Sequence, residues 1–564
     1  MDSGGHVDTD GRCEFSQADR GLVVQVAELV RSLGIKVGPV RPAASDHTAT
    51  RRDGHGKHRI CFTTSQPVFR LPRMLDRLAA AGAVRQHLRI VGAKRVADRP
   101  VRCISVANPH ATFLVEGFVP THNSVLMSNI YAWSALERVR PSGAPGFPGR
   151  RNSLIVFEPK LDGAQEYARW ARSIGDRLLV AEVANPNGLA VDLLDRPGTV
   201  LDRAEFFTEA LRYAFDDGAI QGASAEALRA VLAGGMVVTD DMVDNLQKGA
   251  NARGPILTID KGRSPIYYAH VLLGSLGDDV AVALAEQVED AANAVMRDER
   301  DPYADVVLAN GKLAPIFAGR TPAQRASYCQ APRNKLDAFA SIEHFFAPHR
   351  PKVSWSRVLQ EHLAIVVLTG VDSDGHMMTS YTERLMSSLL MYSLRDSIER
   401  NCSAWEHQNR WVSVFVDELS MIAGNDPEII TWLKNRGRSY GVRPVFATQF
   451  PGQLAPEVRD TFLSFSTLIT FTLDSPTIAK EVVADLAGDG TDWTVGDVLE
   501  LPQHHAIVRA NVDRQRQPPF SFRAGYWSAD EASRQQFIHD QGYGGAAPAG
   551  QFGVGFSSLP EEAA

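Results

Sequence analysis

Three consecutive residues, His122, Asn123 and Ser124, have side chains that could together break a peptide bond. The Asn side-chain amide can attack its own backbone carbonyl, form a succinimide and so cut the bond to the next residue. The His can polarise that carbonyl or protonate the leaving amine, and the Ser hydroxyl can hold an upstream segment as an ester. The tripeptide alone is also typical of an ordinary loop, so the surrounding residues decide between the two interpretations.

The surrounding stretch VRCISVANPHATFLVEGFVPTHNS (101–124) has two apolar, strand-like runs separated by a turn, which favours the chemical interpretation. It resembles the C-terminal splice junction of an intein, with Asn123 as the last intein residue and Ser124 as the first extein residue. The resemblance extends to class 3 inteins, and it implies that Cys103 is a nucleophile and that Thr121 is its partner in the signature. The Trp that completes the signature belongs to an N-terminal splicing block, which this sequence lacks. Taken alone, Cys103 would be a small buried hydrophobe in a strand.

The first residues, MDSGGHVDTDGRCEF, resemble the end of a LAGLIDADG helix and the strand that follows it in homing endonucleases. A helix-like run (21–33) and a strand-like run (59–63) would follow in that fold. Asp2 matches the first acid of the motif, but Gly4 occupies the position of the metal-binding acid, so Mg²⁺ would lose an oxygen ligand. We therefore predict an inactive α+β endonuclease remnant over 1–79 and a β-rich splicing (Hint) segment over 80–123.

A second motif, VSVFVDELS (412–420), is an apolar strand that ends in the adjacent carboxylates Asp417 and Glu418. This is the Walker B arrangement, which brings both acids to the carboxyl edge of a sheet, where nucleotides bind. Asp417 would hold Mg²⁺ and Glu418 would orient the attacking water. An ordinary strand that runs into an acid-capped helix gives the same pattern, and that alternative stays open.

The segment NRGRSYGVRPVFATQFPGQL (435–454) predicts a helix end, a strand and then Gln449 at the strand's tip, as a sensor of the γ-phosphate or the water. The run from DELS to ATQ resembles conjugative coupling ATPases (TraG/TraD-like), within the FtsK–HerA group of hexameric motors. The segment EPKLDG (158–163) resembles the DPKG of that family and implies that Lys160 lies at the nucleotide. Arg436 and Arg438 are candidates for an arginine finger that contacts a neighbour's nucleotide, or are surface arginines at a helix end.

The family resemblance implies ATP and Mg²⁺ as ligands, a homo-hexamer, and DNA or a secreted protein as the substrate. It also implies a membrane-associated secretion channel as a partner and a cytoplasmic location, at the inner face of the membrane where the full-length protein is anchored. Two alternatives stay open. The chain could be a non-enzymatic, degenerate fragment, or its ATPase could be a phage or chromosomal DNA-translocating or packaging motor.

A phosphate loop should accompany these motifs, but the pattern GxxxxGK[ST] does not occur in the sequence. Residues 124–133 nevertheless resemble the helix that follows such a loop, with Leu126, Ile130 and Trp133 on one face. Inteins often interrupt phosphate loops between the Lys and the Ser. Ser124 would then act first as the splicing acceptor and later as an Mg²⁺ ligand, with the glycines and the Lys encoded upstream of Met1. We expect the chain alone neither to splice nor to hydrolyse ATP; splicing itself needs no cofactor.

The remaining pattern predicts an α/β nucleotide-binding fold with a mostly parallel sheet. Buried-strand runs occur at 153–157, 363–369, 411–416, 442–448, 466–473 and 505–512. We assign the core to 124–169 and 351–535, and a helical insertion to 170–350, with amphipathic helices at 282–297 and 324–339. Residues 536–564 end in a Gly- and Ala-rich stretch and are expected to be disordered.

Composition sets only broad limits on the function of this chain. The net charge of −7 over 564 residues excludes a global basic field, so any contact with nucleic acid must be local. The five cysteines show no CxxC spacing, which argues against a zinc ribbon or a disulfide framework. The sequence shows neither a signal peptide nor a run of about 18 apolar residues.

Overall fold

The chain divides into two compact units, residues 1–123 and 124–564, so the division falls at the predicted splice junction. Each unit is described by itself. The computed structural model describes residues 5–8, 12–32, 35, 37–38, 40–42, 57–64, 68, 72–80, 113–115, 119–121, 125–139, 151–215, 220–253, 259–422, 427–449, 451–473, 475–487, 493–502, 504–512, 515–527 and 530–541.

The first unit contains an antiparallel sheet with the strand order β1-β2-β4-β3. Its elements are β1 (Gly5–Val7), β2 (Arg12–Gln17), α1 (Arg20–Ser32), β3 (Arg41–Pro42), β4 (His58–Thr63) and α2 (Pro72–Ala80). Cys13, Val30 and Phe62 are among the apolar side chains of its core. The helix predicted over 21–33 and the strand predicted over 59–63 are both present.

A short antiparallel pair follows in the first unit, made of β5 (Phe113–Val115) and β6 (Val119–Thr121). The strand β6 ends at Thr121, which lies opposite Phe113. This pair matches part of the strand pattern predicted before the junction. Cys103, His122, Asn123 and Ser124 lie outside the described residues.

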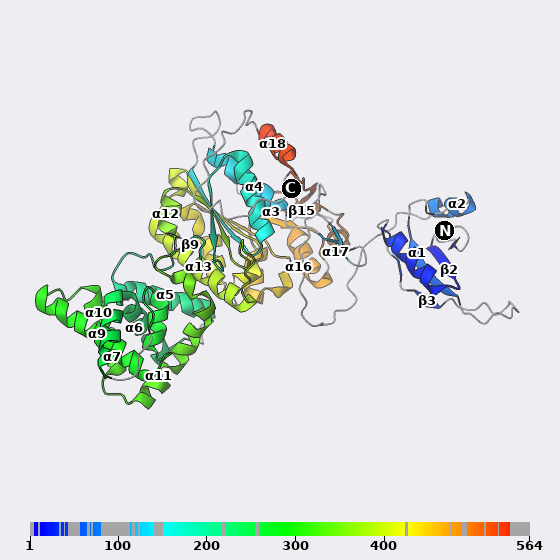
Figure 1. Cartoon of the computed structure of the whole chain (residues 1–564). Helices are drawn as coiled ribbons and strands as arrows, with labels where there is room; N and C mark the ends of the chain where they lie inside the picture. Colours follow the sequence, from blue (N-terminus) through cyan, green and yellow to red (C-terminus); the bar gives the residue numbers. More distant parts are fainter. Residues whose placement is uncertain are drawn as a thin grey trace. The chain divides into compact units, whose positions relative to one another are not determined.

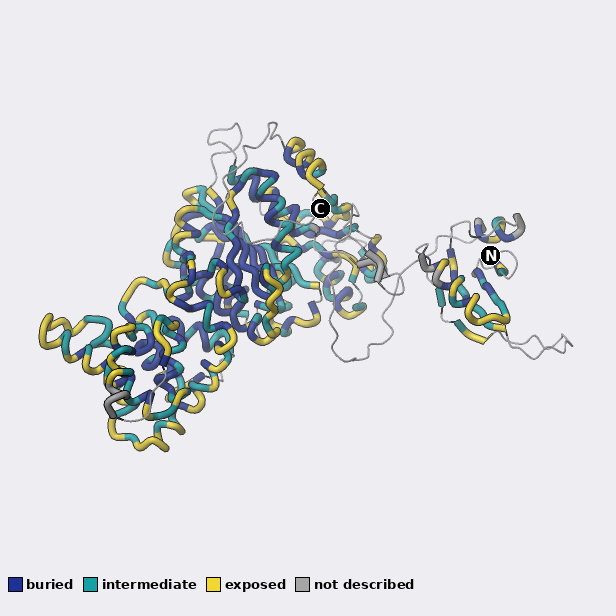
Figure 2. Tube along the Cα trace, in the orientation of Figure 1, coloured by how far each residue is buried: buried dark blue, intermediate teal, exposed yellow. Residues whose placement is uncertain are grey.

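The second unit is built on a parallel sheet with the strand order β13-β12-β7-β11-β8. Its strands are β7 (Arg151–Glu158), β8 (Leu178–Glu182), β11 (Ala364–Leu368), β12 (Arg410–Val416) and β13 (Val442–Phe446). The inner strands are buried on both faces, as their nearly continuous apolar runs require (Figure 2). The α/β fold with a parallel sheet is therefore confirmed.

Helices cover both faces of this sheet (Figure 1). One face packs against α3 (Val125–Val139), α4 (Leu161–Ile174) and α18 (Glu531–Asp540). The other packs against α5 (Val200–Phe215), α12 (Trp355–Gln360), α13 (Ser380–Asn401) and α14 (Glu428–Asn435). Each strand thus alternates its side chains between two separate apolar cores.

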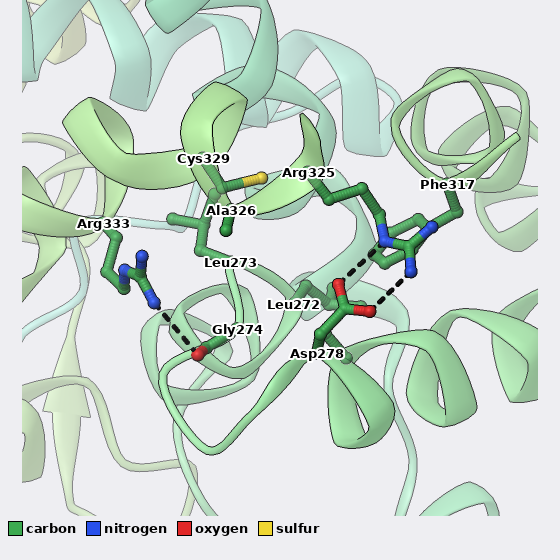
Figure 3. Close-up of a pocket in the computed structure, with 10 residues that line it drawn as sticks. Leu272, Leu273, Gly274, Asp278, Phe317, Arg325, Ala326, Cys329 and Arg333 are labelled. Carbon is green, nitrogen blue, oxygen red and sulfur yellow. Dashed lines mark hydrogen bonds and ion pairs between the residues drawn. The ribbon is translucent and has the colours of Figure 1, made fainter. Parts of the chain in front are cut away.

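A helical region follows β8 and is drawn mainly in green in Figure 1. After α5 it comprises α6 (Ala223–Val237), α7 (Asp240–Arg253), α8 (Pro265–Leu272), α9 (Asp278–Asp298), α10 (Asp305–Phe317), α11 (Pro322–Leu336) and the 3₁₀ helix η2 (Asp337–Phe346). The two helices predicted at 282–297 and 324–339 fall on α9 and on α11 with η2. A small cavity lies here, where Arg325 Nε donates to Asp278 Oδ1 over 2.8 Å (Figure 3).

Two sequence-based boundaries differ from the structure. The insertion predicted from residue 170 contains β8, which pairs with β11 in the core sheet. This short edge strand was missed because so brief an apolar run between two helices resembles helix. The tail predicted to be disordered from 536 begins inside α18, where Phe537 packs against Trp170 with their ring centroids 5.3 Å apart.

The runs at 466–473 and 505–512 do not join the parallel sheet. They contribute β14 (Leu468–Thr470) and β15 (His505–Arg509), which form a separate antiparallel sheet with β18 (Phe520–Arg523). The connection between β15 and β18 is too short for the crossover that parallel strands need. The remaining elements are β9 (Ala190–Val191), β10 (Lys352–Val353), α15 (Pro456–Leu463), α16 (Pro476–Ala487), α17 (Val495–Leu499), β16 (Asn511–Val512) and β17 (Gln515–Arg516).

A search of the described helices finds none that is both long and apolar enough to cross a membrane.

We expect Phe415→Ala to destabilise the second unit by about 3–5 kcal/mol, because truncating a buried Phe leaves a cavity. Phe415 is fully buried in β12 and its ring meets that of Tyr131 edge to face, with centroids 5.9 Å apart. Denaturant unfolding would measure the change. Phe520→Ala is the control, because 51% of Phe520 is already exposed. Equal effects of the two substitutions would contradict the packing described for β12.

Candidate functional site

Polar side chains gather where three neighbouring strands of the parallel sheet end. Glu158 is the last residue of β7, and it lies opposite Leu368 at the end of β11. Asp417 follows β12, and its N–H donates to the carbonyl of Phe157 over 3.2 Å. Because Val416 lies opposite Phe157, the chain positions of Asp417 and Glu158 are side by side at this edge. The carboxyl edge therefore presents adjacent acids on adjacent strands.

Glu418 has an unusual backbone conformation, with φ 70° and ψ 75°. A non-glycine residue rarely adopts a positive φ, and such strain is maintained only where neighbouring contacts fix it. Here the Leu419 N–H donates to the carbonyl of Ala447 over 2.8 Å, which ties the turn to the residue after β13. The strained turn thus changes the direction of the chain immediately after Asp417.

The side chain of Glu418 is held by hydroxyl groups from two segments. Its Oε1 accepts hydrogen bonds from Thr448 Oγ1 at 3.0 Å and from Ser420 Oγ at 2.8 Å. The Gln449 N–H approaches Oε2 at 3.5 Å, and the Gln449 side chain is exposed. The structure thus brings Asp417, Glu418 and Gln449 to one edge. Sequence reasoning missed Thr448, although a hydroxyl residue before Gln449 at a strand end was a usable signal.

Glu158 is a buried carboxylate, with 1% of its surface exposed. Its Oε1 accepts the Lys160 N–H over 3.0 Å. A Cβ at Gly163 would lie 2.3 Å from the Glu158 Cδ, so only glycine leaves room for this carboxylate beside the first turn of α4. Burial, and secondarily the negative charge of Asp417, raise the pKa of Glu158 well above its ordinary value.

A divalent cation would fit this edge, because Mg²⁺ prefers oxygen ligands from one or two carboxylates. Asp417 and Glu158 would supply those oxygens, and the positive charge would offset the negative charge of Asp417, which adds to the effect of burial on the pKa of Glu158. Lys160, which is exposed at the N-cap position of α4, lies at the same edge.

Arg436 and Arg438 lie at the opposite edge of the sheet from Glu418. Arg436 caps the C-terminus of α14, and Arg438 is in the 3₁₀ helix η5 (Gly437–Tyr440), which directly precedes β13. Arg438 Nε pairs with Glu406 Oε1 over 3.0 Å. Within one chain, neither arginine lies near the acids of the carboxyl edge, Asp417 and Glu418. A role of either arginine toward another subunit's nucleotide therefore stays a prediction.

The helix expected after Ser124 is present as α3, which begins at Val125. Its buried side includes Met127, Tyr131 and Ala135, whereas 46% of Trp133 is exposed. Leu126 and Ile130 are half-buried, so the face that they share with Trp133 is the less buried side of α3. The opposite side of α3 is buried because it packs against both α4 and the sheet.

The fold and the site together define an α/β protein whose acidic groups gather at the carboxyl edge of a parallel sheet. No family model matches the chain. Among curated proteins, it is 33% identical over 137 residues to the replicative DNA helicase DnaB of Mycobacterium intracellulare, which covers 22% of this chain and 22% of the helicase. The chain thus spans about a fifth of the length of that relative.

Solved structures of the bacterial conjugative coupling protein TrwB are also similar to this chain. The unbound monoclinic form of TrwBΔN70 is 14% identical, with a TM-score of 0.38, and the alignment covers 71% of this chain and 92% of TrwB. The complex of TrwB with the GTP analogue GDPNP is 14% identical, covers 70% and 92%, and has a TM-score of 0.39. TM-scores in this range do not by themselves establish a shared fold.

We expect Glu158→Gln to stabilise the protein at neutral pH in a buffer that contains EDTA. Between the ordinary and the raised pKa, Glu158 holds a proton in the folded protein but not in the unfolded chain. Folding stability should therefore fall as the pH rises through that window. The Gln variant escapes this loss, so its advantage in unfolding temperature should grow with pH and vanish below the ordinary pKa of 4.5.

Thermal unfolding from pH 4 to pH 8 would measure this advantage. Glu286→Gln, at an exposed position on α9, is the matched control. Parallel pH profiles for the wild type and Glu158→Gln would contradict the prediction.

Proposed function

We propose that residues 124–564 form the core of a motor ATPase that binds Mg-ATP at the carboxyl edge of the parallel sheet. The observation that carries the proposal is Glu418, held in a strained turn by Thr448 and Ser420 directly after Asp417. A carboxylate fixed in this way can orient a water molecule for in-line attack on a phosphate. Residues that are held in strained backbone conformations are concentrated at active sites.

In this proposal each group at the edge has a separate role. Asp417 holds Mg²⁺, which neutralises charge on the phosphates. Glu418 orients the attacking water, Gln449 contacts the γ-phosphate or that water, and Lys160 lies beside the nucleotide. Attack of water on the γ-phosphorus breaks the bond to the β–γ bridging oxygen and yields ADP and inorganic phosphate.

The proposal requires a phosphate loop, and the pattern GxxxxGK[ST] does not occur in this sequence. Ser124 would follow that loop and would coordinate Mg²⁺ once the loop is joined to it. Within the described residues, β13 is an edge strand paired only with β12, which leaves an edge for the strand that would carry the loop. The complete protein would be a homo-hexamer, with Arg436 or Arg438 reaching a neighbour's nucleotide.

The substrate of the complete motor would be DNA or a secreted protein, delivered to a membrane-associated secretion channel. A phage or chromosomal DNA-translocating or packaging motor is the alternative within the same class. The likeness to a DNA helicase covers only 22% of the chain. The motor proposal therefore rests on the strand-end geometry rather than on that likeness.

We expect negligible Mg-ATP hydrolysis by the chain of residues 1–564, because the amides and the Lys of the phosphate loop are needed. After a strand and a GxxxxGK segment are joined directly before Ser124, hydrolysis should appear. Glu418→Gln should then lower turnover about 100-fold or more and leave ATP affinity largely unchanged.

Steady-state phosphate release and calorimetry would measure the two quantities, with the exposed Glu457→Gln as the control. Robust turnover by residues 1–564 alone would show that the nucleotide site is misplaced. If the joined protein binds no ATP, the alternative of a non-enzymatic, degenerate ATPase fold is favoured instead.

We further propose that residues 1–123 are the C-terminal part of an intein, with an inactive endonuclease remnant before the splicing segment. Two observations support this second proposal. The compact units divide between Asn123 and Ser124, and the β5–β6 pair ends at Thr121, immediately before the His-Asn pair. In a complete intein Cys103 would take up the upstream segment as a thioester, and Ser124 would then accept it.

We expect the purified chain to release at most a slow product that begins at Ser124, and Asn123→Ala should abolish this release. The Asn123 amide nitrogen forms a bond to its own carbonyl carbon while the bond to the Ser124 nitrogen breaks. No water is consumed, so the 1–123 product ends in a succinimide and is one water molecule lighter than a hydrolysis product. Intact-protein mass spectrometry would distinguish the two.

Asn108→Ala, in the same segment, is the matched control and should leave the release unchanged. A Ser124-started product that persists in Asn123→Ala would contradict the intein assignment.

A further inference from the structure

A basic side chain stands at the amino end of each strand of the parallel sheet. Arg410 and Arg151 are the first residues of β12 and β7, and Arg177 directly precedes β8. Across the sheet, the order is Arg438 before β13, then Arg410, Arg151, His362 before β11, and Arg177. Neighbouring strands lie about 4.8 Å apart, so these groups form a row rather than a single cluster. We call these five residues the basic row.

Arg151 and Arg410 are direct register partners in the middle of the basic row. Side chains of register partners project from the same face of a sheet, and like charges placed directly opposite each other are destabilising. Burial lowers the pKa of Arg410, and the charge of Arg151 acts in the same direction. Arg410 is nevertheless fixed, because its guanidinium stacks 3.9 Å from the Trp405 ring centroid and its Nε contacts His362 Nε2 at 3.1 Å.

His362 does not add a further charge at neutral pH. Burial lowers its pKa to about 4, with further lowering by Arg410, Arg138 and Arg151. Its neutral ring can therefore accept the hydrogen bond from Arg410 Nε. The centre of the row thus consists of two guanidinium groups and a neutral, polar imidazole.

The acids near this edge are already paired, one of them with Arg438 of the basic row itself. Asp176 pairs with Arg138, Glu406 pairs with Arg438, and Glu361 pairs with Arg357. Across the part of the chain that the structure describes, no carboxylate forms an ion pair with Arg151, Arg177 or Arg410. The segment 140–150, which joins α3 to β7, contains neither Asp nor Glu, so it cannot neutralise the pair. The chain as a whole nevertheless has a net charge of −7.

Helix dipoles explain only part of the positive charge at the amino edge of the sheet. Cations are favoured at helix C-termini, and in this fold those termini lie near the amino ends of the strands. This effect accounts for Arg138 in the last turn of α3 and for Arg436 at the end of α14. Arg151 and Arg410 begin strands instead, and their direct juxtaposition gains nothing from a helix terminus.

We propose that the basic row binds the phosphate backbone of a nucleic-acid strand. An extended polyanion matches a row of charges, and guanidinium groups bind phosphate oxygens in a bidentate manner. The site is at the amino edge of the sheet, opposite the edge that carries Glu158, Asp417 and Glu418. This proposal rests on the proposed function only because it takes DNA as the transported polymer. The binding itself requires no ATP.

The test uses the full chain and a fluorescently labelled thymidine oligonucleotide, with binding measured by anisotropy over a series of salt concentrations. Removing one arginine that binds a phosphate should lower the slope of log K against log salt by about 0.7 for a single strand. We expect a reduction of about 0.7 for R151Q and about 1.4 for R151Q/R410Q, with weaker binding at every salt concentration.

R203Q/R229Q removes the same charge from the helical region, where these arginines pair with Asp305 and Glu205, and should leave the slope unchanged. R151Q alone keeps the test valid if the double variant unfolds, because Arg151 is exposed and begins its strand. An unchanged slope in R151Q would overturn the proposal. Binding of pyrophosphate without binding of the oligonucleotide would also overturn the proposal, because the basic row would then bind the phosphates of a nucleotide. A completed motor that hydrolyses no ATP would contradict the proposed function, but it would not change the oligonucleotide binding or the salt slope expected here.

Discussion

The in-register parallel pairing of β7 with β12 is the constraint on which both chemical edges of the second unit depend. At one end it places Glu158 next to Asp417, and at the other it places Arg151 next to Arg410. Both juxtapositions are repulsive, so the apolar residues between them must hold the register. Residues 152–157 and 412–416 are buried, and burial of each large apolar side chain contributes about 1.5–3 kcal/mol.

The two edges of the sheet carry opposite charge, and their helices account for part of the difference. The N-terminus of α4 lies beside Glu158, and helix N-termini favour negative charge. The dipole is too small to lower the pKa of a carboxylate that is also buried beside Asp417, and that pKa is raised. A divalent cation would offset such repulsion at the carboxyl edge, and a phosphate would offset it between Arg151 and Arg410. In the two proposals the sheet thus separates two ligand chemistries along its strands.

Much of this arrangement could be predicted from the sequence, because buried parallel strands have an unmistakable apolar pattern. The pattern predicted β7, β11, β12 and β13, and it placed Asp417 and Glu418 at a strand end. The pattern could not give the strand order. The sequence therefore could not predict that Glu158 lies beside Asp417 or that Arg151 lies beside Arg410. The room that Gly163 leaves for Glu158, and the positive φ of Glu418, depend on contacts between distant segments. The short edge strand β8 lacked the length that separates a strand from a helix by pattern alone.

The packing of α3 bears on how the two proposed activities can coexist in one chain. Tyr131 is fully buried and meets Tyr167 and Phe415 edge to face, at 4.9 and 5.9 Å between ring centroids. The helix α3 is thus anchored in the core of the second unit. A cut before Ser124 would leave these contacts in place. In the proposed reaction, Asn cyclisation would release residues 1–123 without disturbing the packing of α3.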